Sequence, residues 1–207
     1  MHKETLAQET AKLFARLGKD GNLRKDGFYL AGGTALALHL GHRQSIDLDF
    51  FTKERDLPKY LLEYLESVGK FKVVQQEDRT LHAILNGVRI SFISFPYPLL
   101  YPLLEMEGVM LADERDIATM KISAISGRGA KKDFIDLYVL LQKYSLEDIL
   151  ADFERKFAGR EYSRLHILKS ISYFDDANAE DEPVMLARYS WADVKNKLTS
   201  EAKRLAE

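Results

Sequence analysis

The sequence contains no cysteine among its 207 residues. Disulfide bonds, thiol nucleophiles and thiolate metal sites are therefore excluded. No apolar run is long enough for a membrane-spanning helix. The start, MHKETLAQETAKLFARLGK, is charged and amphipathic and has no apolar core like that of a signal peptide. These absences predict a cytoplasmic protein without membrane contact.

The chain also lacks a large excess of either charge. Its formal net charge is -2, and 46% of its residues are apolar and 30% are charged, as in ordinary globular proteins. A surface that is basic throughout is excluded, so any contact with nucleic acid must depend on a local basic patch. The length is sufficient for a buried core in one domain or in two small ones.

The first half of the chain alternates between helix-like and strand-like patterns. Helices are expected at residues 4–17, 34–40 and 56–69: Gly18 with the KDGN turn after it ends the first, Gly41 closes the second, and Asp56 is a candidate cap for the third. Strands are expected at 28–32, 46–51, 71–78, 80–87 and 88–95, with a hairpin turn at Asn86-Gly87. Three prolines, at 96, 98 and 102, indicate a rigid connector after the last strand.

From residue 113 onward the pattern is helical throughout. Helices are expected at 113–126, 131–144, 145–157, about 163–174 and 190–207, with Ser145 and Ser190 as caps. We therefore predict an α+β fold: a domain with a mixed sheet and flanking helices at 1–112, and a helical domain at 113–207.

Asp47 and Asp49 interrupt an apolar segment, IDLDFF. Strand side chains alternate between faces, so both carboxylates point one way, about 7 Å apart at the backbone, while Ile46, Leu48 and Phe50 point the other way. Two like charges at that spacing repel each other, and Mg²⁺ is the usual remedy because it prefers carboxylate oxygens. An exposed sheet edge with two solvated aspartates is the simpler alternative.

Gly32, Gly33 and Thr34 stand between the preceding strand and a helix. Glycines at such a turn let the backbone approach a phosphate closely, with free amide groups pointing at it, and the threonine hydroxyl adds a donor. A helix N-cap would explain the threonine equally well. Combined with the two acids on the return strand, the arrangement suits a nucleoside triphosphate with a metal held opposite.

The stretch GGTALALHLGHRQSIDLDFF resembles the nucleotidyltransferase superfold, and within it the AbiEii/AbiGii-type toxin family of type IV toxin–antitoxin and abortive-infection systems. Later residues, namely Lys121, the Lys132-Asp133 pair and Asp136, resemble that family's third and fourth motifs. The resemblance extends over residues 28 to 141.

The resemblance implies a Mg²⁺-dependent enzyme that moves a nucleoside monophosphate from a nucleoside triphosphate to an acceptor hydroxyl, in RNA and especially at a tRNA end. Asp47 and Asp49 would hold the metal and the reactive phosphates, and Gly33 with Thr34 would contact the triphosphate beside Gly32. A cognate antitoxin protein would be the partner. A small-molecule acceptor such as an antibiotic, or a non-catalytic module that binds nucleotide or a partner, are the alternatives.

Several charged residues have two explanations each. Arg43 helps to bind phosphate or merely occupies a loop. Lys121 lies on the apolar stripe of its helix, where it either extends along a core edge or reaches a phosphate. For Asp133, near Asp136, the resemblance implies a base that accepts the acceptor's proton, and helix capping is the competing explanation. The segment SGRGAKKD, with Arg128 and Lys132, grips phosphate or RNA backbone or is an ordinary solvated loop.

One position departs from the pattern of the superfold. Nucleotidyltransferases commonly carry a third metal-binding carboxylate on a later strand, and by parity the matching position here is Ser91, with Arg89 on the same face. A serine there puts a two-metal mechanism in doubt. The acceptor cleft is expected to include residues of the helical half such as Lys169, Tyr173 and Arg188.

Overall fold

The structure is a computed structural model that describes residues 1–206. The chain divides into two compact units, unit 1 from Met1 to Asp113 and unit 2 from Glu114 onward. The division predicted between residues 112 and 113 lies next to this boundary. The two units are described separately.

Unit 1 is built on a seven-stranded sheet with the strand order β3-β4-β5-β2-β1-β7-β6. The strands are β1 (Tyr29–Leu30), β2 (Leu48–Thr52), β3 (Phe71–Glu77), β4 (Thr80–Leu85), β5 (Val88–Ser94), β6 (Leu104–Met106) and β7 (Val109–Leu111). Two pairs, β2 with β5 and β1 with β7, are parallel, and the remaining neighbours are antiparallel. The sheet is therefore mixed, as the sequence predicts.

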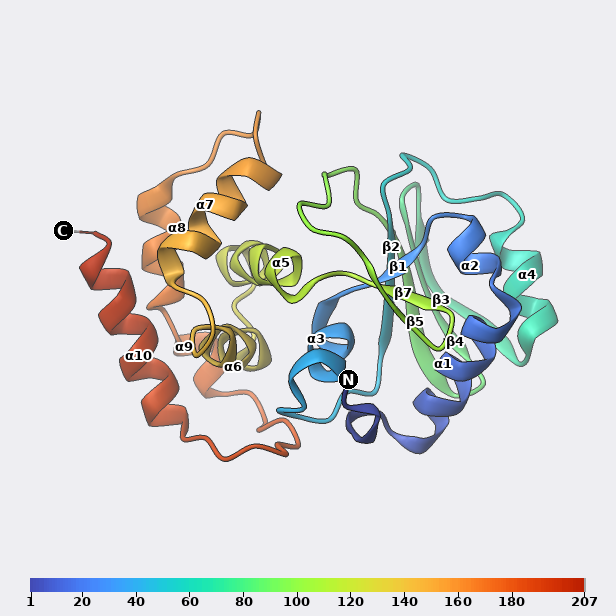
Figure 1. Cartoon of the computed structure of the whole chain (residues 1–207), viewed down its shortest axis with the longest axis horizontal. Helices are drawn as coiled ribbons and strands as arrows, with labels where there is room; N and C mark the ends of the chain where they lie inside the picture. Colours follow the sequence, from blue (N-terminus) through green and yellow to red (C-terminus); the bar gives the residue numbers. More distant parts are fainter. Residues whose placement is uncertain (207) are drawn as a thin grey trace. The chain divides into compact units, whose positions relative to one another are not determined.

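Helices cover both faces of this sheet. They are the 3₁₀ helix η1 (Lys3–Thr5) and the α-helices α1 (Gln8–Asp20), α2 (Asn22–Lys25), α3 (Gly32–Leu40) and α4 (Leu61–Val68). Helix α3 lies on one side of the sheet, and α1, α2 and α4 lie on the other (Figure 1). The strand–glycine turn–helix–strand order expected around residues 28–51 is present.

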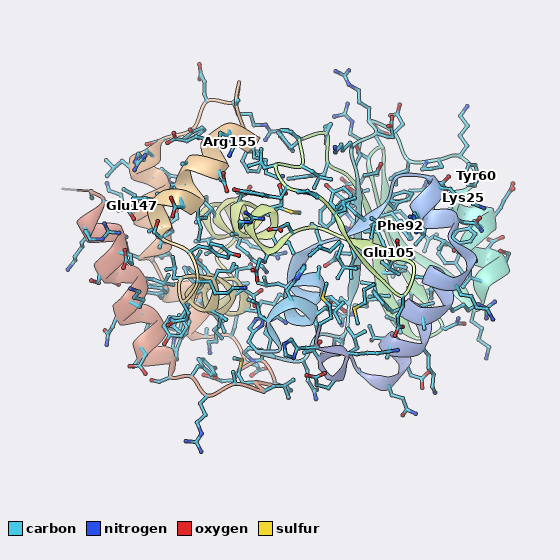
Figure 2. The ribbon with its side chains drawn as sticks, viewed as in Figure 1. Lys25, Tyr60, Phe92, Glu105, Glu147 and Arg155 are labelled. Atoms are coloured by element: carbon cyan, nitrogen blue, oxygen red, sulfur yellow. The ribbon has the colours of Figure 1, made fainter. Side chains whose placement is uncertain are left out.

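The core of unit 1 is aromatic where the central strands meet the helices. The ring of Phe92, labelled in Figure 2, is fully buried between the rings of Phe28 and Phe50, with centroid distances of 5.2 Å and 5.5 Å. Such edge-on and stacked pairs contribute beyond the area that they bury. They fix β2 against β5, and β2 is the strand that carries Asp49.

Gly18 itself does not end the first helix, which ends instead within the KDGN turn that was predicted beside it. Gly18 is buried within α1, which continues to Asp20 and ends at Gly21, a residue in the left-handed conformation (φ 67°). A Cβ atom at Gly18 would lie 2.0 Å from the carbonyl oxygen of Glu107. Gly18 is therefore required for close packing of α1 against the turn between β6 and β7.

One further local prediction in unit 1 is wrong, and one hairpin was not predicted. Asp56 does not cap α4, whose N-cap residue is Tyr60 and which has no side-chain cap. The connector after β5 leads into the β6–β7 hairpin, which the sequence patterns did not reveal. Its turn contains Glu107 and Gly108, both with positive φ, and Gly108 packs against the backbone of Gly18. By contrast, the Asn86-Gly87 turn joins β4 to β5 as predicted.

Unit 2 is helical. Its helices are α5 (Glu114–Gly127), α6 (Lys131–Leu140), α7 (Leu146–Lys156), α8 (Arg164–Ile171), α9 (Asp175–Asn178) and α10 (Trp191–Arg204). Helix α5 packs against α6, α7 and α8, and α10 packs against α6 and α8 (Figure 1). The short helix α9 was not predicted. Among the helices of the described residues, none has the length and apolar character needed to cross a membrane.

Capping and a buried ion pair determine where α7 lies in unit 2. The Ser145 hydroxyl accepts a hydrogen bond from the Asp148 amide and caps α7 as predicted, whereas Ser190 makes no such bond at α10. At the other end of α7, the Lys156 ammonium donates to the Asp116 carboxylate of α5 at 2.5 Å. Both side chains are fully buried, so this pair ties the two helices in a single register.

Candidate active site

Glycine is required for a different structural reason at each of the first two positions of α3. Gly32 has a φ of 67°, a left-handed conformation that glycine adopts without strain. A Cβ atom there would lie 3.3 Å from a carboxylate oxygen of Asp49. The Asp49 carboxylate of β2 therefore lies close to the first residue of α3, and a side chain at that position would press against it.

Gly33 makes room for the guanidinium group of Arg43. A Cβ atom at this position would lie 2.3 Å from Nη2 of Arg43, whose side chain is buried and also donates to the Gln44 carbonyl oxygen at 3.1 Å. A helix N-terminus carries a partial positive charge, and a guanidinium beside it strengthens the attraction for an anion. We call Gly32, Gly33, Arg43 and Asp49 the glycine cradle.

Thr34 is engaged within unit 1. Its hydroxyl donates to the main-chain carbonyl oxygen of Asp47 and lies 2.7 Å from the Ser45 hydroxyl, and the side chain is buried. It is not the N-cap, which is Ala31 and has no side-chain cap. The Thr34 hydroxyl was expected to donate to a phosphate. It instead joins the first turn of α3 to the chain before β2.

Asp47 and Asp49 are both half-buried, and Leu48 and Phe50 between and after them are fully buried. Asp47 immediately precedes β2, which begins at Leu48. The Oδ1 atom of Asp47 is buried and has no hydrogen-bond partner among the described residues. Ile46 was expected on the buried face, but its exposed fraction is 57%, because regular strand pairing begins only after Asp47.

Residues that the sequence patterns did not single out fix the segment before Asp47. The Ser45 amide donates to the Thr5 carbonyl oxygen at 2.9 Å, and the Thr10 hydroxyl donates to the Ile46 carbonyl oxygen, also at 2.9 Å. With the Thr34 hydroxyl bonded to Asp47, three elements hold this loop. No local signal reveals these bonds, because each partner lies far away in the sequence.

Ser91 lies where strand parity places it. It is in parallel register with Asp49 on β2 and opposite His82 on β4. The Ser91 hydroxyl is 3.0 Å from Nδ1 of His82. Asp49, Ser91 and His82 thus form a polar row across three neighbouring strands, and the row contains one carboxylate.

The residues around the glycine cradle fit one divalent cation. A buried carboxylate oxygen without a partner costs about 1–3 kcal/mol, and a hard cation would satisfy it. Asp47 supplies such an oxygen, and Asp49 supplies a second carboxylate two residues later. Within residues 1–206, no group of three or more histidine and acidic side chains is placed to bind a metal ion.

In unit 2, Lys121 is buried with the two acids of the later motif. Its ammonium lies 2.8 Å from a carboxylate oxygen of Asp133 and 2.6 Å from one of Asp136, and all three side chains are almost inaccessible to solvent. We call these three residues the lysine cluster. Asp133 also accepts from Nε of Arg128 at 3.4 Å. Lys121 therefore bridges the two carboxylates, and Arg128 adds a second cation at Asp133, which favours a role in holding α5 against α6.

The basic loop between α5 and α6 is only partly exposed. Arg128 and Lys132 are exposed, whereas Lys131 is buried, lies over the Trp191 ring at 5.6 Å and donates to the carbonyl oxygen of Glu180.

Of the residues expected in an acceptor cleft, Lys169 and Tyr173 line a common pocket with Arg128. Arg188 is exposed and is not part of that pocket's lining.

Comparison with known proteins identifies the family. The profile described as "Nucleotidyl transferase AbiEii toxin, Type IV TA system" matches residues 22–204. An uncharacterized protein of Aquifex aeolicus (strain VF5) is 38% identical over 159 residues, which cover 74% of this chain and 76% of that protein.

Solved structures show the same fold. MenT4, a nucleotidyltransferase toxin from Mycobacterium tuberculosis, aligns with a TM-score of 0.60 at 15% identity over 100% of this chain and 87% of its own. JHP933 from Helicobacter pylori aligns with a TM-score of 0.58 at 15% identity over 97% and 93% of the two chains. The chain has the nucleotidyltransferase fold and belongs to the AbiEii family of nucleotidyltransferase toxins of type IV toxin–antitoxin systems.

Proposed function

We propose that the protein transfers a nucleoside monophosphate from a nucleoside triphosphate to a hydroxyl group of RNA, with tRNA ends as the foremost acceptor, and that it acts as a toxin. The observation that carries this proposal is the buried, unpartnered Oδ1 of Asp47 beside the glycine cradle. The family supports nucleotidyl transfer as the reaction class. The RNA acceptor and the requirement for Mg²⁺ go beyond what the family supports and are part of the proposal.

The proposed roles in unit 1 follow from charge and position. Asp47 and Asp49 would hold Mg²⁺, which when bound neutralises phosphate charge and orients the α-phosphorus for in-line attack. The main chain at Gly32 and Gly33 approaches the triphosphate, and the Arg43 guanidinium offers it charged donors. Thr34 keeps the carboxylates and the turn at a fixed distance.

The roles proposed for unit 2 are more limited. Lys132 and Arg128 are exposed and basic, and they would contact phosphates of the acceptor. Lys121 and Asp133, which the resemblance associates with catalysis, form a buried ion pair, and the Lys121 ammonium also pairs with Asp136. Either this ion-paired state is the working state and shapes the unit, or the lysine leaves its partners for a phosphate. The stability test described in the Discussion separates these two roles.

A transfer assay tests the proposal. The full chain is incubated with Mg²⁺, total RNA and each of the four labelled nucleoside triphosphates in turn, and label on RNA is measured with pyrophosphate release. Asp49→Asn is expected to abolish the signal, and Asp78→Asn, an exposed acid in the turn after β3, is expected to preserve it. Undiminished transfer by Asp49→Asn would remove the proposed site.

A second candidate function is a module that binds nucleotide without transferring it. The observation that favours it is Ser91, which stands where a third carboxylate would complete a two-metal site. Calorimetry with each nucleoside triphosphate and Mg²⁺ distinguishes the two, because this candidate predicts binding without pyrophosphate release. The toxin assignment further predicts a neutralising protein, for which the product of the neighbouring gene is the first to test by co-expression.

A further inference from the structure

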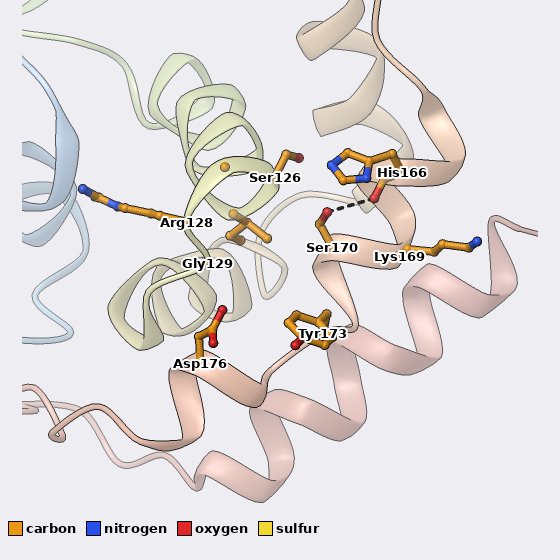
Figure 3. A pocket seen from close by; sticks show the side chains of 10 residues that line it. Ser126, Arg128, Gly129, His166, Lys169, Ser170, Tyr173 and Asp176 are labelled. Carbon is orange, nitrogen blue, oxygen red and sulfur yellow. Dashed lines mark hydrogen bonds between the residues drawn. The ribbon is translucent and has the colours of Figure 1, made fainter.

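Unit 2 contains a pocket of about 330 Å³ whose lining includes Arg128 and the expected cleft residues Lys169 and Tyr173. It lies between the end of α5, the loop that follows it, and helices α8 and α9. Its interior is formed by Ser126, Gly129, His166, Ser170, Tyr173 and Asp176 (Figure 3). This volume is at the lower end of the range for small-molecule sites, so the pocket suits one compact group.

An exposed aromatic ring forms one wall of this pocket. Tyr173 follows α8, and 57% of its surface is exposed. Its ring faces the space beside Gly129 and Asp176 (Figure 3). Aromatic rings that stand partly free at a polar pocket are the platforms on which unpaired nucleobases stack.

Basic side chains stand at two opposite rims. Arg128 and Lys169 extend in opposite directions from the pocket (Figure 3). The Lys169 side chain is exposed, and the His166 imidazole lies between the rims near Ser126 (Figure 3). Cations on both sides of one aromatic pocket match a chain with a phosphate before and after each base, better than they match a single free anion.

Acidic groups are also present, and they narrow the choice of ligand. Asp176 lines the pocket, and the carboxylates of Asp175 and Asp176 raise the pKa of Tyr173. Carboxylates repel a bare phosphate but accept hydrogen bonds from ribose hydroxyls and exocyclic amino groups. A ligand that has donors at its centre and negative charge at its ends satisfies both sets of groups.

We infer that this pocket binds one unpaired nucleotide of the acceptor RNA, with its base against Tyr173 and its flanking phosphates at Lys169 and Arg128. The inference rests on the proposed function, because it supplies the acceptor site for that reaction. The Ser170 and Ser126 hydroxyls donate to carbonyl oxygens of their own helices at 2.9 Å, which leaves their oxygen atoms as acceptors facing the ligand.

The test measures RNA binding without the reaction. A short, labelled single-stranded RNA is titrated with the full chain by fluorescence anisotropy, with no nucleoside triphosphate and with a chelator present. Tyr173→Ala is expected to weaken binding about 5- to 140-fold, the range for loss of one stacked base. Tyr173→Phe, which retains the ring, is expected to bind within about twofold of the unmodified protein.

Two charge variants test the rims. Lys169→Ala is expected to reduce the dependence of log Kd on log salt concentration by about 0.7, the value for one phosphate contact on a single strand. Lys19→Ala removes an equally exposed lysine at the end of α1 and is expected to leave both affinity and salt dependence unchanged. Melting curves by circular dichroism confirm that each variant is folded.

The outcomes separate this inference from the proposed function. Asp49→Asn is expected to bind RNA normally, so binding that depends on Tyr173 supports the pocket even where the transfer assay fails. If neither Tyr173→Ala nor Lys169→Ala weakens RNA binding while the transfer reaction persists, the inference is overturned and the proposed function is not. Displacement of the RNA by inorganic phosphate at matched ionic strength would reveal a simple anion site and would also overturn it.

Discussion

Asp49 and Ser91 stand side by side in register on the parallel strands β2 and β5. The hydroxyl of Ser91 is in turn hydrogen-bonded to His82. Asp49 on β2 therefore has a neutral neighbour at the position where a third acid was expected. In the proposed metal site, the negative charge comes from Asp47 and Asp49.

Replacing Ser91 by aspartate is expected to tighten Mg²⁺ binding by roughly tenfold or more, because ligand charge count tunes such sites over orders of magnitude. Calorimetric titration with Mg²⁺ measures the affinity and the number of ions bound. Ser67→Asp, which adds the same charge on the exposed face of α4, is the matched control and should leave the affinity unchanged. Equal affinities in all three proteins would contradict a metal site at Asp49.

Replacing Asp47 by asparagine is expected to raise the melting temperature of the metal-free protein by roughly a few degrees, because a buried charge without a partner is removed. Added Mg²⁺ should stabilise the unmodified protein and leave Asp47→Asn unaffected, since a ligand that binds only the folded state raises its stability. Melting curves with and without Mg²⁺ measure both effects, with Asp78→Asn as a control. The same shift by Mg²⁺ in every protein would contradict the assignment.

Replacing Lys121 by methionine is expected to destabilise the chain by about 3–5 kcal/mol, because two buried carboxylates lose their shared cation. Adding Asp133→Asn and Asp136→Asn removes the buried charges and should restore much of that loss. Urea denaturation measures the free energy of unfolding. If the triple variant recovers its stability without transfer activity, the cluster takes part in the reaction; if activity returns as well, its role is structural.

Replacing Gly18 by alanine is expected to cost about 1–3 kcal/mol or more, because the new methyl group meets the Glu107 backbone, which cannot move alone. Replacing Gly33 by alanine displaces only the end of the Arg43 side chain. Its cost in stability should be smaller, and its main effect should be a raised KM for the nucleoside triphosphate. Melting curves and steady-state kinetics on both variants compare the two, and a reversed order of stability would contradict these packing assignments.

Acid is expected to weaken unit 2 through the pair between Glu147 of α7 and Arg204 of α10. Hydrogen bonding by Arg204 lowers the pKa of Glu147 from 4.5 to about 2. A lowered pKa in the folded state stabilises above pH 4.5, and that contribution is lost as the pH falls toward 2. The effect is small because both groups are exposed. Melting temperatures over this range should fall less steeply for Glu147→Gln, whereas Glu161→Gln, an exposed control, should match the unmodified protein.

The order of elements around Asp47 and Asp49 was predictable because each signal there is local. Glycines mark the turn, apolar residues mark the buried strand, and parity places Ser91 beside Asp49. The same local logic predicts the Asn86-Gly87 hairpin and the Ser145 cap.

The remaining features depend on partners that are distant in the sequence. Gly18 resembles a helix terminator, and only its contact with Glu107 explains a glycine inside α1. The buried state of Lys121 follows from two acids on another helix, and a stripe pattern does not reveal their charge balance. Thr34 resembles a cap or a phosphate donor in the sequence, and only the structure shows that its hydroxyl donates a hydrogen bond to the main-chain carbonyl oxygen of Asp47.

That single hydroxyl has a further effect on how the nucleotide would be received. Because it links the first turn of α3 to the residue before β2, the proposed anion-binding turn and the acidic strand cannot move apart independently. In the proposed function, the nucleotide site is therefore already formed when unit 1 folds. Little of the energy gained on capturing a nucleotide has to be spent on ordering the protein, and more of it is left for holding the triphosphate in a reactive pose.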